Sequence, residues 1–300
     1  MHDKTRRTAL AALAALALVW GYNWVVMKIA TRYAPPVEFA ALRLLLGACV
    51  LFAIMPVLRK PLRPQYPLAY VAIGVFQSGA FVALATWAVI SAGAGKVSIL
   101  SYTMPLWVAV LARPVLGERL HARHIIALTV AAAGIVLILG FWNARGSLFS
   151  DVIAIIAGVC WAIGVVLTKR LQMHAKPDVL SLTTWQMLFG GIVVGIAAIF
   201  VPSHATHWTW IYGGALAYNV FLASALAYVL WIFVLNHLPA RDASIGTLAN
   251  PIVGIIAAWL QLGEVPAVNE SIGMALVIVA LVVLALSPPQ QQRIADDKQT

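Results

Sequence analysis

Five amide side chains lie deep inside long apolar runs, and these residues are well suited to recognising a small polar molecule. They are Asn23, Gln77, Gln186, Asn219 and Asn250. An amide without a hydrogen-bond partner is costly in hydrocarbon, so each should face the interior of a helix bundle. There it could bind a ligand or form an interhelical hydrogen bond worth about 0.6 kcal/mol. For any one amide taken alone, we favour the interhelical bond.

Large aromatic residues share helical faces with these amides. In the first apolar run, one stripe at helical spacing consists of Trp20, Asn23, Trp24, Met27 and Thr31. The sixth run has an equivalent stripe, which consists of Trp161, Gly164, Val165 and Thr168. Tryptophan usually marks membrane interfaces, but Trp20 and Trp161 fall about half-way along their runs. Such residues are more often packing contacts, yet two at equivalent positions suit a cavity for apolar or aromatic groups, where ring stacking adds about 0.5–1.5 kcal/mol.

Three cationic residues also deserve separate interpretation, because charge at the centre of a bilayer costs at least about 2.5–3.5 kcal/mol. Lys28 and Lys169 lie near the ends of their runs and can extend to the interface. Arg43 lies deeper. Facing a cavity, it could bind a carboxylate; paired with Glu38, which is only five residues away, or with carbonyl groups, it would be structural. We favour the structural role, with a partner on another helix.

The sequence contains few residues suited to catalysis or to metal binding. Membrane enzymes need acid clusters for a metal or phosphate, or a nucleophile with a base. The only adjacent acids are Asp296 and Asp297, near the C-terminus, and no histidine lies beside a plausible nucleophile at membrane depth. Cys49 and Cys160 both fall mid-run, without partners for a metal, and are expected to pack. We therefore expect no enzyme, no metal and no cofactor.

The composition indicates a membrane protein. Of 300 residues, 62% are hydrophobic and 10% charged, with a mean hydropathy of +0.92. Crossing about 30 Å of hydrocarbon takes about 20 apolar residues, and the spans must be helical because irregular backbone cannot face lipid. The expected spans are 9–31, 37–58, 68–91, 95–115, 121–142, 151–171, 179–201, 210–237, 242–262 and 267–287.

The positive charges predict the orientation of these spans. If the N-terminus is cytoplasmic, fifteen of the twenty Lys and Arg residues lie in inside-facing segments and three in outside-facing ones. This asymmetry places both termini in the cytoplasm by the positive-inside rule, and it explains the net charge of +10 without a nucleic-acid partner. The first run is longer than a signal peptide's apolar region, so we expect it to be retained.

One stretch of sequence occurs twice. Residues 98–118 match residues 244–264 without a gap, aligning Pro105 with Pro251 and Glu118 with Glu264. Proline bends a helix and frees a carbonyl, so we expect these two prolines to be hinges. The two glutamates follow helix-ending glycines and should be gates or supports. Because each copy would hold five helices, an odd number, the second copy should be inverted in the membrane.

These features resemble the drug/metabolite transporter superfamily, specifically its EamA-type exporters. The resemblance rests on the two five-helix units, the paired P…L-G-E segments, and a W-x-x-x-x-x-x-x-K segment in each unit, from Trp20 to Lys28 and from Trp161 to Lys169. The many aromatic residues look like those of bacterial aromatic-amino-acid and metabolite exporters. The expected fold is an all-α membrane protein of ten helices in two inverted repeats, at 9–142 and 151–287, with a cytoplasmic segment 1–8, a linker 143–150 and a disordered tail 288–300.

The resemblance implies a secondary transporter of the inner cell membrane that exports amino acids, preferably aromatic or apolar, and related metabolites by alternating access. No carboxylate lies mid-membrane, so we expect uniport or exchange; a proton-coupled antiporter and a channel are the alternatives. The expected partners are a small-molecule substrate and lipid. The sequence does not define the oligomeric state, and a monomer is compatible with it. The expected cavity residues are Trp20, Asn23, Trp24, Gln77, Phe81, Ser98, Tyr102, Trp161, Thr168, Trp185, Gln186 and Asn250.

Overall fold

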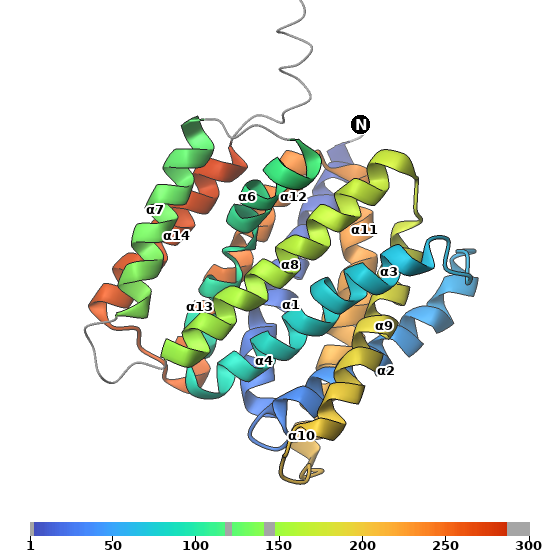
Figure 1. Cartoon of the computed structure of the whole chain (residues 1–300), viewed down its shortest axis with the longest axis horizontal. Coiled ribbons are helices and arrows are strands. Elements are labelled where there is room, and N and C mark those ends of the chain that lie inside the picture. Colours follow the sequence, from blue (N-terminus) through green and yellow to red (C-terminus); the bar gives the residue numbers. More distant parts are fainter. Residues whose placement is uncertain (1–2, 118–121, 141–147, 287–300) are drawn as a thin grey trace, which may run out of the picture.

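The protein is an all-helical bundle in the part of the chain that the structure describes. The structure is a computed structural model, which describes residues 3–117, 122–140 and 148–286. Ten helical segments are long and apolar enough to cross a membrane, as expected (Figure 1). They are Thr5–Ala30, Pro36–Val57, Pro67–Ser91, Ala94–Leu116, Ala122–Leu139, Leu148–His174, Val179–Phe200, Trp210–His237, Ile245–Leu262 and Val268–Ala285.

The same order of elements occurs twice along the chain. The first unit consists of α1 (Asp3–Ala30), α2 (Pro36–Val57), α3 (Pro67–Ile73), η1 (Gly74–Ala80), α4 (Phe81–Ser91), α5 (Ala94–Ser101), α6 (Met104–Leu116) and α7 (Ala122–Leu139). The second consists of α8 (Leu148–His174), α9 (Val179–Phe200), α10 (Trp210–Ala217), η2 (Tyr218–Leu226), α11 (Ala227–His237), α12 (Ala240–Thr247), α13 (Ala249–Leu262) and α14 (Val268–Ala285). This repetition agrees with two five-helix repeats.

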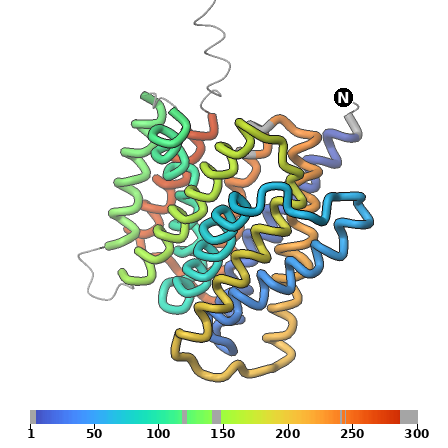
Figure 2. Tube along the Cα trace, turned by 45° about the vertical axis from the view of Figure 1, so that its right-hand side comes forward, coloured from blue at the N-terminus to red at the C-terminus, as the bar shows by residue number. Residues whose placement is uncertain are grey.

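The two units interlock rather than lie side by side. Helix α1 packs against α11 and α13 of the second unit, and α8 packs against α4 and α6 of the first. Equivalent helices of the two units are also in contact, α2 with α9 and α7 with α14 (Figures 1 and 2). The ends of α1 and α14 nearest the chain termini lie at one end of the bundle, which we name the terminal face. The end where α1 finishes and α8 begins is the opposite face.

Glycine allows the closest of these helix contacts. A Cβ atom on Gly134 of α7 would lie 2.7 Å from the carbonyl oxygen of Gly273 on α14. A Cβ on Gly273 would in turn lie 2.6 Å from the carbonyl oxygen of Gly134. The two backbones are therefore in direct contact, as is usual where small residues bring membrane helices together.

The duplicated proline segments are broken helices, which corrects the expectation of a bend. The fourth span is interrupted between α5 and α6, and Pro105 lies in the first turn of α6. Pro251 likewise lies in the first turn of α13, just after the end of α12. Proline is well tolerated in a first turn, where its missing N–H has no intrahelical acceptor to lose. Each segment does end at a left-handed glycine, Gly117 and Gly263, as expected.

Candidate functional site

The two broken helices are joined at their breaks by one hydrogen bond. The Asn250 amide Nδ2, in the first turn of α13, donates to the Tyr102 hydroxyl at the end of α5, at 2.6 Å. The Trp24 ring of α1 meets the Tyr102 ring edge-on, with centroids 6.4 Å apart. Three of the expected cavity residues, from three different helices, are therefore in contact at the interface of the units.

Several polar atoms around this contact have no hydrogen-bond partner within the described residues. They include Asn250 Oδ1 and the Ser98 hydroxyl, both on buried residues. Asn23 Oδ1 of α1 is also buried without a partner in the described part of the chain, while its Nδ2 contacts Met27 of the same helix. The Ser98 hydroxyl lies against Gly254, where a Cβ would be 2.7 Å away, so α5 and α13 approach closely here. Buried polar atoms without partners are uncommon in folded proteins, and at a site they are available to a ligand.

Two further aromatic pairs join the units in a symmetric arrangement. Trp20 of α1 lies 6.0 Å from Tyr228 of α11, while Trp161 of α8 lies 4.8 Å from Phe81 of α4. Each unit thus places the tryptophan of its first helix on an aromatic residue of the other unit's third span. Trp231 adds a further ring 6.0 Å from Trp20. We had not selected Tyr228 or Trp231, although their three-residue spacing on one helix face was visible in the sequence.

Both third spans contain a π-helical segment, which the sequence did not lead us to expect. Segments η1 and η2 lie at equivalent points of the two units, immediately before Phe81 and shortly before Tyr228. The η1 backbone touches α9, because a Cβ on Gly190 would lie 2.5 Å from the Gly74 carbonyl oxygen. Short π-helical segments occur frequently at functional sites, since they shift the side chains that follow them.

Four of the expected residues lie away from the Tyr102–Asn250 contact. Trp185 donates to the Leu62 carbonyl at 3.1 Å in the α2–α3 connection of the terminal face, which removes it from the interior. Thr168 donates to the Gly164 carbonyl of its own helix, and Gln77 packs against Gly164. Gln186 is buried beside η1, with its Oε1 unpartnered within the described residues.

Arg43 lies inside the bundle without the partner we had expected. Its side chain is 8% exposed, in the buried stripe of α2. No ion pair joins it to Glu38 in the described part of the chain; Oε1 of Glu38 accepts a 2.8 Å hydrogen bond from the Thr206 hydroxyl. Within the described residues the guanidinium has an electrostatic interaction with Tyr228 but no ion pair.

Ion pairs tie the helices together at the opposite face. Lys28, at the end of α1, pairs with Glu264 at 3.3 Å and donates to the Ala92 carbonyl at 2.9 Å, so it does not merely extend to the interface. Glu264 also accepts from the Gly95 amide at 3.3 Å. This glutamate therefore supports the turn before α5. Its expected counterpart, Glu118, lies outside the described residues.

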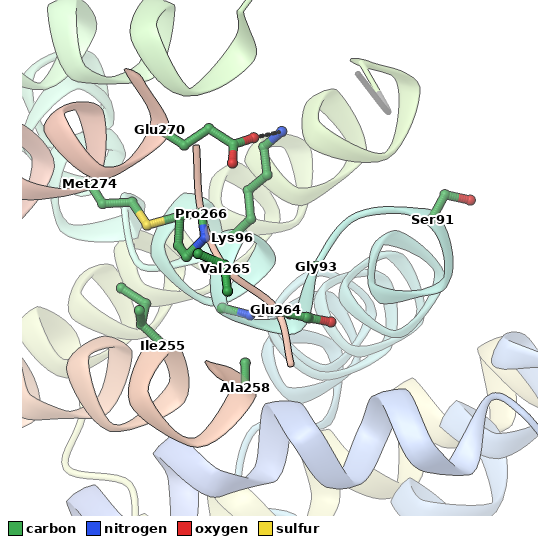
Figure 3. A pocket seen from close by; sticks show the side chains of 11 residues that line it. Ser91, Gly93, Lys96, Ile255, Ala258, Glu264, Val265, Pro266, Glu270 and Met274 are labelled. Carbon is green, nitrogen blue, oxygen red and sulfur yellow. Dashed lines mark hydrogen bonds and ion pairs between the residues drawn. The ribbon is translucent and has the colours of Figure 1, made fainter. Parts of the chain in front are cut away.

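A second cation, Lys96, joins two acids beside this pair. Its ammonium lies 2.9 Å from Asp151 and 2.8 Å from Glu270. Asp151, in the first turn of α8, is fully buried. A cavity of about 320 Å³ opens next to these groups, between Lys96, Glu264 and Glu270 on one side and Ile255 and Met274 on the other (Figure 3). Within the described residues no cluster of His, Cys, Asp or Glu could hold a metal ion.

Comparison with known proteins agrees with this arrangement. The profile of the EamA-like transporter family matches residues 7–140 and 148–286, one match for each unit. "Uncharacterized transporter YoaV" of Bacillus subtilis (strain 168) is 28% identical over 274 residues, covering 89% of this chain and 93% of its own. "Probable amino-acid metabolite efflux pump" of Escherichia coli (strain K12) is 27% identical over 291 residues, covering 92% and 94%.

Two further comparisons concern the membrane and the fold. "Uncharacterized inner membrane transporter YedA" of Escherichia coli (strain K12) is 24% identical over 281 residues, covering 92% of this chain and 90% of its own. A protein of known crystal structure superposes with a TM-score of 0.66 over 93% of this chain and 98% of its own, and at 17% identity it shows the fold alone. With both units matched by the family profile, this chain belongs to the EamA-like transporter family.

Proposed function

We propose that this transporter exports small amphipathic molecules, with aromatic and apolar amino acids first among them. The observation that carries the proposal is the site around Tyr102 and Asn250. There, the Trp24 and Tyr102 rings lie beside buried polar atoms that have no partner in the described part of the chain, and two further aromatic pairs join the units. Rings bind an apolar side chain, and the free amide and hydroxyl groups bind polar atoms of the same ligand.

The direction of transport rests on orientation and on the relatives. Lys and Arg concentrate in the α2–α3 and α8–α9 connections, which follow helices that run towards the terminal face; these connections hold Arg59, Lys60, Arg63 and Lys176. The positive-inside rule then places this face in the cytoplasm. One relative is named an inner membrane transporter and another an amino-acid metabolite efflux pump, which supports export across the inner membrane.

Alternating access would proceed by rocking of the two units around the site. The breaks at Tyr102 and Leu248 separate α5 from α6 and α12 from α13, so the two parts of each span can reorient. Broken helices at equivalent positions of inverted repeats commonly surround a transporter's binding site. The ion pairs of Lys28 and Lys96 would hold the opposite face closed while the site opens to the cytoplasm.

A counterflow measurement with purified protein in liposomes tests this function. Liposomes loaded with unlabelled phenylalanine should take up labelled phenylalanine faster than empty ones, and uptake should saturate. Leucine, lysine and a flat organic cation added outside would rank the substrates by competition. Absence of counterflow for every compound would refute the proposal, and single-channel conductance in planar bilayers would favour a channel.

Proton-coupled antiport is the second candidate function, and Asp151 is the observation in its favour. This carboxylate is fully buried and lies beside Lys96, an arrangement in which protonation could release the ion pair. Uniport or exchange remains our proposal, because Asp151 lies at a helix end rather than mid-membrane. The two are separated by dissipating a pH gradient while the substrate gradient is held fixed. Exchange predicts an unchanged rate, whereas a collapse would establish coupling.

A further inference from the structure

We propose that Arg43 binds the carboxylate of the transported molecule, in a subsite between α2 and the third span of the second unit, η2 and α11. This inference rests on the proposed function, since it assigns one chemical group of the substrate to one residue. If Arg43 has this role, the transported ligands carry a carboxylate; zwitterionic amino acids and simple aromatic acids are examples.

The first support is the burial of an unpaired charge. Arg43 is 8% exposed, and its Nε atom is buried without a hydrogen-bond partner in the described structure. No ion pair to Arg43 occurs among residues 3–117, 122–140 and 148–286. An arginine inside a membrane protein ordinarily pairs with an acid or with backbone carbonyls. The guanidinium of Arg43 is thus left with donors to offer a ligand.

The second support is that the acids that could have neutralised Arg43 are held elsewhere. Glu38, on the same helix, accepts its hydrogen bond from Thr206. Asp151 and Glu264 pair with lysines at the opposite face. A substrate carboxylate would supply the missing counter-charge, and the planar guanidinium can bind it through two parallel hydrogen bonds.

The third support is the set of groups facing Arg43. One turn further along α2, Gly47 packs against Ser224, where an added Cβ would lie 3.1 Å from the Ser224 Cβ. Tyr228 follows Ser224 by one turn of the same span, and its hydroxyl is near enough to Arg43 to interact electrostatically. The Tyr228 ring lies 6.0 Å from the Trp20 ring. A ligand whose carboxylate contacts Arg43 could therefore place an aromatic side chain against these rings.

The test compares three ligands that share a phenyl ring, using purified protein and tryptophan fluorescence or scintillation proximity. Phenylalanine has both charged groups, 3-phenylpropionate keeps only the carboxylate, and phenethylamine keeps only the amine. The wild-type protein should bind the two carboxylates more tightly than phenethylamine. This ligand series needs no variant, so it does not depend on a mutant that folds.

Substitutions then assign the preference to Arg43. Arg43→Gln should weaken binding of both carboxylates roughly 10- to 100-fold, the range for losing hydrogen bonds to a charged group, and should leave phenethylamine within about twofold. Arg43→Lys should recover part of the loss because it restores the charge without the planar fork. Arg32→Gln, at an exposed arginine of the opposite face, is the matched control and should behave as wild type. Thermal melting of each variant shows whether it is folded.

The outcomes separate this inference from the proposed function. Equal weakening of all three ligands in a folded Arg43→Gln protein would show a packing role and overturn the inference. A wild-type preference for phenethylamine would also overturn it, while leaving transport of amphipathic molecules intact. Failure of the wild-type protein to bind or exchange any of the three would instead count against the proposed function.

Discussion

The Trp20 ring and the Tyr228 ring lie 6.0 Å apart and join the first helix of one unit to the third span of the other. Trp161 and Phe81 repeat this relationship at 4.8 Å with the units exchanged. The indole nitrogen of Trp20 also donates to the Ala223 carbonyl of η2 at 3.0 Å, which fixes the ring against the π-helical segment. The two pairs occupy equivalent places in the two units.

The Tyr228 ring should contribute to the affinity for aromatic substrates. Tyr228→Ala is expected to weaken phenylalanine binding roughly 2- to 10-fold, since an aromatic pair is worth about 0.5–1.5 kcal/mol beyond the area it buries. Tyr228→Phe keeps the ring and should stay within about twofold. Competition for labelled phenylalanine measures both, with the exposed Phe200→Ala as a control. Equal affinity of the Ala and Phe variants would contradict a role for the ring.

The hydrogen bond between Tyr102 and Asn250 should stabilise the interface of the units. Tyr102→Phe removes the acceptor of the Asn250 amide, whose side chain is 1% exposed, and leaves it unsatisfied. We expect a loss of about 1–3 kcal/mol in the free energy of unfolding. Tyr66→Phe removes a hydroxyl from an exposed tyrosine and is the matched control. Denaturant unfolding followed by tryptophan fluorescence compares them, and equal stability of the two variants would argue against the bond.

The two lysines of the opposite face should differ in their contribution to stability. Lys28 and Glu264 are 19% and 21% exposed, and Lys28 also donates to the Ala92 carbonyl, so Lys28→Met should cost about 1–2 kcal/mol. Lys96 faces the fully buried Asp151, so Lys96→Met should cost about 3 kcal/mol or more. Adding Asp151→Asn to Lys96→Met should restore part of that loss. The same unfolding assay decides, and a larger effect at Lys28 would reverse our interpretation.

The contact between Gly134 and Gly273 should tolerate no side chain. Gly134→Leu would push α7 away from α14, and we expect a loss of about 1–3 kcal/mol or a failure to fold. Gly213→Ala is the control, because no atom lies within 4 Å of a Cβ placed there. Size-exclusion chromatography and thermal melting report the difference. A Gly134→Leu protein as stable as Gly213→Ala would show that the helices separate without penalty.

Much of the fold could be predicted from the sequence because hydrocarbon imposes a simple rule on each span. Every run needs about 20 apolar residues, so composition alone marks where helices cross. The helix breaks before Pro105 and Pro251 were harder to predict from the sequence, because a proline is compatible either with a bend in a helix or with the start of a new helix. The π-helical segments left no sequence signal, because the spans that contain them are apolar on most faces, so a rotation of the following side chains does not disturb any clear apolar stripe.

The candidate site was predicted in part, and the errors concern side chains whose surroundings come from another helix. Trp24, Tyr102 and Asn250 were selected and are in contact. Trp185 was selected as a cavity residue, yet its indole nitrogen donates to the Leu62 carbonyl near the terminal face. Arg43 was expected to have a structural partner, but Glu38 is engaged by Thr206. Such pairings depend on residues distant in the chain, which periodicity within one run cannot reveal.

The exchange of first helices between the units bears on how the protein is made. The Trp20 indole binds a carbonyl 203 residues further along the chain, on a helix synthesised long after α1. Chains are folded progressively from the N-terminus during synthesis. Helix α1 therefore enters the membrane with Trp20 still lacking the surface that it finally contacts. Only insertion of the last helices completes the burial of the first, so we expect a chain truncated after the first unit to be recognised as unfinished and degraded.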